Sequence, residues 1–265
     1  MEPRSFTTPN GLQLEVRISS GSIEIETADT TEATLEIRNE RDPGDFNIEL
    51  TERSGGGHRL VVEERRRKAF TFGFSRELQV NVRCPEATVV EADSGSADLR
   101  VRGRVGSVAF HSGSGDLTFE ESEGDVVVKL GSGDIEGRHA RGDLVANTGS
   151  GDIRVDRVEG EVVARTASGD VQVGASGPSV QITTASGDVR VDGVSRGEAT
   201  LRSVSGDVEV GVARGTNVWL DLSSVSGDTV SDLEMGDGPG PGETAALELR
   251  ASTVSGDIHV RSTSA

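Results

Sequence analysis

The sequence predicts an all-β protein, a parallel β-solenoid with 18-residue coils of two short strands, preceded by an N-terminal β cap region. Three observations predict it: an internal repeat of fixed period, apolar residues that alternate with polar ones inside each repeat, and a small, aliphatic composition. The tripeptide Ser-Gly-Asp marks the repeat, and a degenerate copy, Ser96-Ala97-Asp98, precedes the others. Its aspartates are Asp116, Asp134, Asp152, Asp170, Asp188, Asp207, Asp228 and Asp257. From Asp98 to Asp188 the spacing is 18 residues five times running, and it then becomes 19, 21 and 29. A fixed period of this kind is the signature of a repeat architecture.

Each repeat divides into two strands. In the unit 152–169, residues 153–156 and 162–166 alternate between apolar or small and polar side chains, and Gly160 lies between them. Alternation with a period of two, bounded by glycine, is typical of half-buried strands. Two strands and two turns fill 18 residues, so no helix is expected in the repeat.

Stacked coils place equivalent residues about 4.8 Å apart, the spacing of neighbouring strands in any sheet. We therefore expect three inward columns of equivalent residues. They are Leu99, Leu117, Ile135, Ile153, Val171, Val189 and Val208; Val108, Val126, Leu144, Val162 and Val180; and Thr148, Thr166 and Thr184. An antiparallel meander of hairpins is the alternative architecture, but it does not require identical residues at an 18-residue interval.

We expect two regions, an N-terminal β region over residues 1–90 that caps the solenoid and a β-solenoid repeat domain over residues 91–265. Residues 1–90 lack the repeat but contain alternating segments that predict strands, at 12–18, 23–25, 46–50, 60–62, 70–74 and 78–82. Solenoid ends need such caps because an open end exposes unpaired strands. Near the other end, the glycine- and proline-rich run 236–242 predicts a loop.

Composition and charge limit the function. The formal charge is −18, with 45 acidic against 27 basic residues, which argues against nucleic acid or an anionic membrane as the partner. No run of about 18 apolar residues predicts a membrane span. The N-terminus lacks the apolar segment of a signal peptide, so the expected location is the cytoplasm. A single cysteine, Cys84, cannot form an intrachain disulfide.

The run Leu78-Gln79-Val80-Asn81-Val82-Arg83-Cys84-Pro85, followed by serial Ser-Gly-Asp units, resembles the bacterial putative-adhesin family of β-strand-repeat domains. The resemblance covers about residues 12–262 and is clearest over 78–262. It implies a β-repeat fold with a non-catalytic, adhesive or envelope-associated role, and it brings no catalytic residues. It also suggests an association with the cell envelope, although the chain shows no export signal.

The aspartate column is the most conspicuous chemical feature. Stacked carboxylates about 4.8 Å apart repel one another by roughly 0.9 kcal/mol per neighbour in water. Asx-type turns, in which each carboxylate accepts hydrogen bonds from backbone N–H groups or the adjacent serine, would offset this repulsion. A calcium ladder is the alternative, with the ligands Asp116, Asp134, Asp152, Asp170 and Asp188. The turn ladder is favoured, because the repeat calcium motif places a residue between glycine and aspartate and this sequence does not.

No catalytic site and no cofactor are predicted. The four histidines lack the spacing of metal ligands, and Cys84, before a proline at a strand end, is expected to pack rather than react. An outward column does carry an apolar stripe at Val127, Val145 and Val163, which continues through polar residues to Trp219. We interpret it as an interaction stripe, covered either within the chain or by another subunit of a homo-oligomer.

The predicted function is therefore a non-enzymatic scaffold or interaction module for an unknown protein or surface partner. Two alternatives stay open: an accessory protein in envelope-stress signalling, suggested by the resemblance alone, and a carbohydrate-active β-helix enzyme. The enzyme would need one coil whose outward Asp, Arg or His side chains break the column pattern and converge, and no such coil is evident in the sequence.

Overall fold

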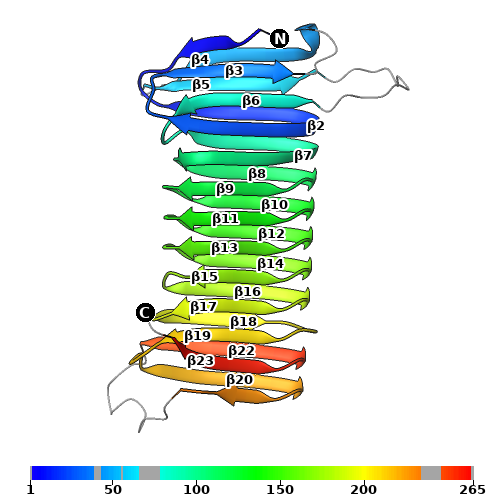
Figure 1. Ribbon diagram of the computed structural model, residues 1–265, viewed down its shortest axis with the longest axis vertical. Helices are drawn as coiled ribbons and strands as arrows, with labels where there is room; N and C mark the ends of the chain where they lie inside the picture. Colours follow the sequence, from blue (N-terminus) through cyan, green and yellow to red (C-terminus); the bar gives the residue numbers. More distant parts are fainter. Residues whose placement is uncertain (1, 39–42, 55, 66–77, 234–245, 264–265) are drawn as a thin grey trace, which may run out of the picture. The chain divides into compact units, whose positions relative to one another are not determined.

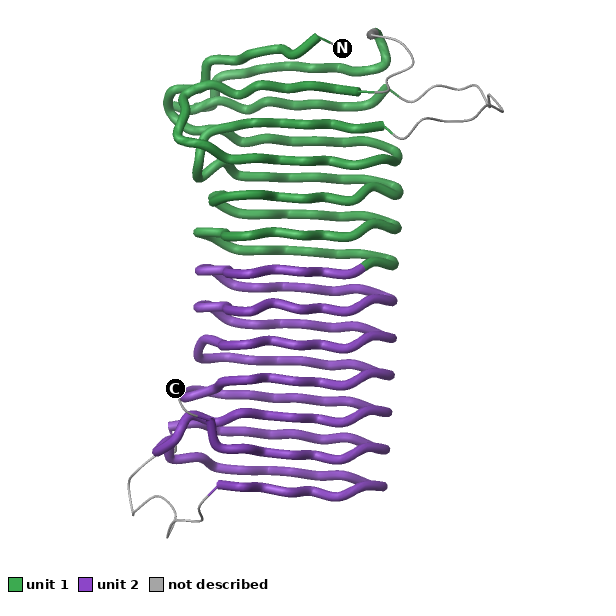
Figure 2. Tube along the Cα trace, in the orientation of Figure 1, with its two compact units in different colours: residues 1–133 green, residues 134–265 purple. Residues whose placement is uncertain are grey.

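The computed structural model describes residues 2–38, 43–54, 56–65, 78–233 and 246–263, and these are almost entirely β-strand (Figure 1). A short 3₁₀ turn, η1 (Pro43–Asp45), is the helical element of this described part. The chain forms two compact units, residues 1–133 and 134–265, which Figure 2 colours separately. The strands expected at 70–74 and the loop expected at 236–242 lie outside the described residues.

The second unit is a stack of coils with two strands each. The successive strands are β11 (Ile135–Ala140), β12 (Leu144–Ser150), β13 (Ile153–Val158), β14 (Val162–Ser168), β15 (Val171–Ala175), β16 (Ser179–Ser186), β17 (Val189–Val194), β18 (Gly197–Arg202), β19 (Val208–Ala213), β20 (Val218–Ser226), β21 (Thr229–Ser231), β22 (Leu247–Ser255) and β23 (Ile258–Thr263). Strands of neighbouring coils pair in parallel, and β11 on β13 aligns Ile135 with Ile153, 18 residues later. This pairing confirms the parallel β-solenoid and excludes the antiparallel meander.

The predicted inward columns form the core. The aliphatic residues of this unit at the two main column positions are at most 2% exposed, and the threonines of the third column are at most 7% exposed. The side chains that alternate with them are half-buried or exposed, as in β13, where Ile153 and Val155 are buried and Arg154 and Asp156 are exposed. Because two facing sheets leave a narrow interior in every coil, short aliphatic side chains fill it without aromatic rings.

The glycine of Ser-Gly-Asp makes the corner between the two strands of a coil. Gly151, Gly169 and Gly187 have φ between +139° and +144°, a region that side chains of L-residues rarely adopt. The corners also stack closely, because a Cβ added to Gly169 would lie 2.1 Å from the carbonyl oxygen of Gly151. Only glycine satisfies both requirements.

Replacing a corner glycine should therefore destabilise the solenoid. We expect Gly169→Ala to lower the free energy of unfolding by about 3 kcal/mol or more, through backbone strain and the clash with Gly151. Gly193→Ala is the matched control, because its added Cβ would meet its nearest atom at 3.7 Å. Chemical denaturation of the two variants gives the comparison, and equal losses would contradict this role of the corner.

The last coils do not stack in chain order. β22 pairs with β18 on one side and with β20 on the other, and β23 pairs in the same way with β19 and β21. The coil at 247–263 thus lies between its two predecessors. The inward residues explain this order: Ile258 and Val260 in β23 are fully buried, whereas the corresponding Thr229 and Ser231 in β21 are polar and exposed. The more polar coil occupies the end of the stack, where water reaches it.

The position of the coil at 247–263 between its two predecessors can be tested by truncating one inward residue in this coil and one in the coil of β20 and β21. Ile258→Ala should cost roughly 2–5 kcal/mol of stability because Ile258 is 0% exposed. Leu222→Ala, in the half-buried terminal strand β20, should cost about 1 kcal/mol. If the coils stacked in chain order, Leu222 would be the enclosed residue and equilibrium unfolding would show the reverse ranking.

The first unit combines stacked coils with antiparallel strands. Its strands are β1 (Arg4–Thr7), β2 (Leu12–Ala28), β3 (Glu32–Arg38), β4 (Phe46–Glu52), β5 (His58–Glu64), β6 (Gln79–Pro85), β7 (Val89–Val105), β8 (Ser107–Ser114), β9 (Leu117–Ser122) and β10 (Val126–Ser132). β8 and β9 pair in parallel with the two halves of β7, and β10 pairs in parallel with β8. Strands β1, β3 and β4 make antiparallel pairs at the margin of this unit.

Parallel stacking begins earlier in the chain than the repeat indicated. β2 pairs with β7 in the register of a coil, which aligns Gly21 with Ala97 and Ser22 with Asp98. Gly21 has the positive φ of the corner glycines. Residues 12–28 therefore form a coil within the region expected to cap the solenoid. That residues 1–90 cap the solenoid stays a prediction.

Candidate functional site

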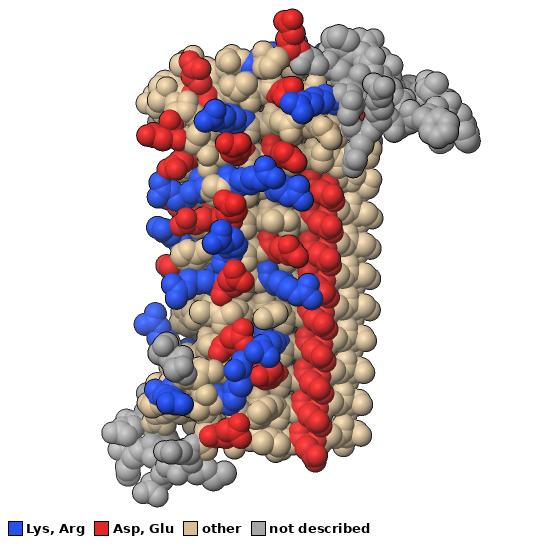
Figure 3. All heavy atoms as spheres, in the orientation of Figure 1, with Lys and Arg blue, Asp and Glu red and all other residues tan. Residues whose placement is uncertain are grey.

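The aspartates of the second unit form a hydrogen-bonded ladder along one edge of the stack. The backbone N–H of each aspartate donates to Oδ1 of the aspartate in the preceding coil. The donor–acceptor pairs are Asp152–Asp134 at 2.8 Å, Asp170–Asp152 at 2.9 Å, Asp188–Asp170 at 2.9 Å, Asp207–Asp188 at 2.8 Å, Asp257–Asp207 at 2.8 Å and Asp228–Asp257 at 2.8 Å. In the first unit, Asp116 N–H donates to Asp98 at 3.0 Å. Figure 3 shows the carboxylates gathered in an acidic column.

These hydrogen bonds connect coils instead of closing a local Asx turn, which would join residues two positions apart. Each bond links an ionised carboxylate to a backbone N–H, an arrangement about twice as strong as a neutral hydrogen bond, and it offsets the repulsion between neighbours. In the described residues, no group of three or more His, Cys, Asp or Glu side chains is placed to hold a metal ion. Calcium binding by the five aspartates named above stays the alternative to the hydrogen-bonded ladder.

The residues of the predicted apolar stripe differ in their exposure. Val145 and Val163 are half-buried neighbours on β12 and β14, and Val127 is a half-buried residue of β10 in the first unit. Trp219 is 45% exposed on β20, where Arg250 lies over its ring at 5.4 Å from the centroid.

Polar residues continue this column after the valines, and Trp219 lies in a different column. The valine column runs on through Gln181, Thr200, Arg250 and Asp221, whereas Trp219 aligns with Glu248 and Glu198. Trp219 therefore does not extend the valine surface, and the interaction role of the stripe stays a prediction.

Sequence reasoning missed another apolar feature. Val204, Val225 and Val254 are among the most exposed large hydrophobic residues of the described chain. Each valine stands directly before a Ser-Gly-Asp tripeptide and directly after a Ser or Thr. In earlier repeats the position of the valine is occupied by glycine or alanine. That change of residue type was the available signal.

A hollow of about 300 Å³ lies on the first unit, over strands β2, β3, β6 and β7. Its charged lining is Glu24, Glu26, Glu36, Arg38, Arg83, Arg100 and Arg102. Arg38 donates two hydrogen bonds of 2.8 Å to Glu36, and the pair lowers the pKa of Glu36 and raises that of Arg38. Arg100 lies 3.6 Å from Glu24. Four of the seven charged side chains in the lining thus form two ion pairs.

Cys84 is packed as expected. It is 0% exposed, and burial raises the pKa of its thiol from the usual 9.0 to about 11, although a hydrogen bond with Thr88 acts in the opposite direction. The thiol is therefore protonated at neutral pH, and a protonated thiol is a poor nucleophile.

This burial predicts a loss of stability in alkali. The unfolded thiol ionises near pH 9 and the native thiol near 11, so the stabilisation is complete below pH 9 and is lost as the pH rises to about 11. The difference amounts to about 3 kcal/mol. Because the chain has no tyrosine and two lysines, few other groups titrate there. Denaturation between pH 8 and 11 should show the decline in the native chain and its absence in Cys84→Ala; a decline of equal size in both would contradict the assignment.

Comparison with known proteins gives the same fold. A "putative adhesin" from Parabacteroides distasonis has a TM-score of 0.54 at 14% identity, over 97% of this chain and 95% of that one. A "putative adhesin" from Parabacteroides merdae has a TM-score of 0.52 at 11% identity, over 99% of this chain and 95% of that one. No curated protein matches the sequence. None of the described helical segments has the length and apolar character needed to cross a membrane.

The family model described as Toastrack DUF4097 matches residues 11–261, a range that begins beside β2 and ends within β23. It includes the first coil, at residues 12–28, and most of the inserted coil at 247–263. The chain belongs to the Toastrack DUF4097 family.

Proposed function

We propose that the chain is a non-enzymatic β-solenoid scaffold that binds a protein or surface partner through its outer faces. The observation that carries this proposal is the carboxylate ladder of the second unit. Each Oδ1 is fixed by a backbone N–H, so the aspartates form a rigid acidic edge with a regular spacing of about 4.8 Å.

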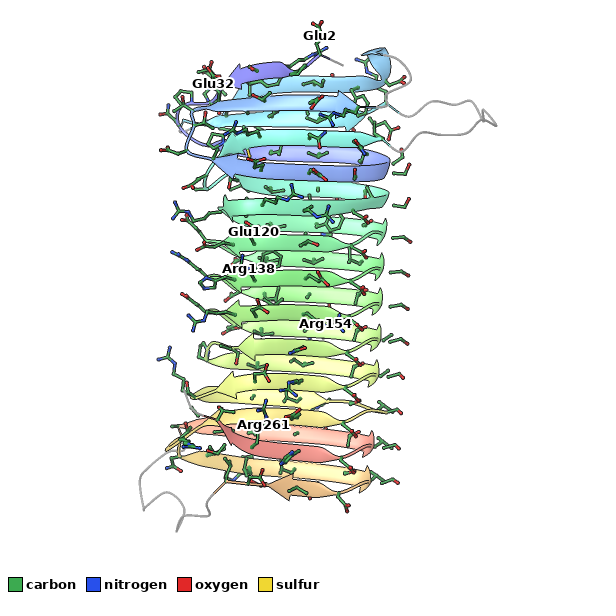
Figure 4. All side chains as sticks on the ribbon, viewed as in Figure 1. Glu2, Glu32, Glu120, Arg138, Arg154 and Arg261 are labelled. Atoms are coloured by element: carbon green, nitrogen blue, oxygen red, sulfur yellow. The ribbon has the colours of Figure 1, made fainter. Side chains whose placement is uncertain are left out.

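The neighbouring sheet face supports the same role. Its charged side chains pair with one another: Arg190 lies 2.5 Å from Glu209, and Arg261, labelled in Figure 4, contacts Asp192 at 2.8 Å and Glu209 at 2.7 Å. The positive and negative side chains of this face neutralise one another in ion pairs between strands. The ladder therefore contributes much of the unit's net negative charge. A partner with cationic groups along an extended surface has the matching charge.

The structural neighbours named as adhesins also support a binding role at this level. Under the proposal, recognition depends on a fixed array of charges, and no bond in the partner is made or broken. Electrostatic recognition of this kind is sensitive to salt, because exposed charges are screened over about 10 Å at 0.1 M ionic strength.

Affinity capture with three forms of the full chain tests the proposal. The baits are the native chain, a ladder variant and a control variant of equal charge change. The ladder variant is Asp152→Asn, Asp170→Asn and Asp188→Asn, in which each amide oxygen can still accept the N–H of the next coil. The control is Glu136→Gln, Asp156→Asn and Glu161→Gln, at exposed positions off the ladder. A fourth bait, Val145→Lys, tests the valine stripe.

A partner that the native chain captures from a cell extract is then purified, and its affinity for each bait is measured. We expect the ladder variant to bind at least about tenfold more weakly, a change of 1.4 kcal/mol, and the control to bind as the native chain does. Failure to retain any partner, equal weakening by both triple variants, or turnover of a polysaccharide by the native chain would overturn the proposal. Unchanged stability, oligomeric mass and partner affinity in Val145→Lys would remove the stripe from it.

A further inference from the structure

Three exposed valines form a ridge on the second unit. Val204, Val254 and Val225 are 53%, 50% and 78% exposed, and they occupy the same position beside the corner in three coils. The coils are adjacent: Ser255 N–H donates to the carbonyl oxygen of Val204 at 3.0 Å, and pairing of β20 with β22 places Val225 beside Val254. We call Val204, Val254 and Val225 the valine ridge.

The ridge is confined to these three coils. The same corner position carries Gly149, Ala167 and Ala185 in earlier coils of the unit. Exposed valine gains nothing from the corner geometry, which glycine and alanine already satisfy. Contiguous apolar surface of this kind is typical of a contact with another molecule.

The spacing of the ridge indicates what it contacts. Its side chains repeat about every 4.8 Å, the distance between stacked strands. An α-helix presents its side chains every 5.4 Å along its axis, and one face of a strand presents them about every 6.6 Å. Only another β-stack matches the ridge residue for residue. We propose that the valine ridge is the contact of a homodimer, in which it packs against the ridge of a second copy of this chain.

Charge selects the orientation of the two copies. Asp207, Asp257 and Asp228 run along one side of the ridge, three residues after its valines, and Arg202 lies on the other side, two residues before Val204. Arg202 is exposed and has no ion-pair partner within the described chain.

Two parallel copies, related by a two-fold axis along the stack, place the aspartates of each copy opposite the Arg202 side of the other. Antiparallel copies would place aspartate columns opposite each other, which is unfavourable. The structure therefore favours the parallel dimer. This dimer goes beyond the proposed scaffold role, which does not require self-association.

Sedimentation of the full chain over a wide concentration range tests the dimer. We expect the native chain to dimerise and Val225→Lys to weaken dimerisation by at least about tenfold, since a lysine in the ridge would be desolvated against its copy. Val230→Lys is the matched control, because Val230 is 48% exposed in the same coil but lies on β21, after the corner. A monomeric native chain, or equal weakening by both variants, would overturn the dimer; partner capture would still test the scaffold role separately.

A cysteine crosslink tests the orientation. In the parallel dimer, thiols introduced by Val204→Cys lie across the axis from each other, and diamide can take up the two electrons and two protons released as they join. In the antiparallel dimer they are two coils apart, roughly 10 Å, which exceeds the Cα separation of a disulfide. We expect covalent dimers from Val204→Cys and none from Val230→Cys. The native Cys84 is buried and does not compete. Crosslinking by Val230→Cys alone would overturn the parallel arrangement.

Discussion

The close approach of backbones at the Ser-Gly-Asp corner is the constraint on which the rest of the structure depends. A carbonyl oxygen occupies the space where a side chain would begin at Gly169, so each corner must lie directly over the one before it. Register is thereby fixed once per coil, at a point outside the core. The aliphatic columns and the carboxylate ladder both follow from this, because a slip of one residue would turn every inward side chain to the solvent.

The ladder shows how a repeat can tolerate like charges in contact. Stacking alone would place aspartates at an unfavourable distance, yet the same register brings the N–H of the next coil to each Oδ1. The hydrogen bond that corrects the repulsion thus exists only when the coils are aligned. Register and charge therefore support each other, and the acidic edge is a structural part of the corner as well as a surface that a partner can meet.

The period of the aspartates was sufficient to predict the fold, the inward columns and the existence of the ladder. The coil at 12–28 could not be found by the same route, because Ser22 stands where Asp98 stands in the next coil and the tripeptide is lost. The order of the last coils was also hidden, since a period read along the chain assumes that neighbours in sequence are neighbours in space. The polar Thr229 and Ser231 were the sign that their coil belongs at an end. The valines beside the corner were overlooked for a different reason: their column carries glycine or alanine in the earlier coils, so the repeat itself shows no apolar stripe there.

The inserted coil has a consequence for how the protein reaches its native state. Residues 218–231 are synthesised before residues 247–263, and both coils carry the corner that stacks on β18 and β19. The earlier coil can therefore dock first in the place that the later coil finally occupies. To reach the native order, the coil at 218–231 must then dissociate from β18 and β19 so that the more apolar coil at 247–263 can pair with them. The stack therefore does not form by simple addition of successive coils at one end. Folding of this region is expected to include a slow exchange step, with a trapped species that already has parallel strands but the wrong succession of coils.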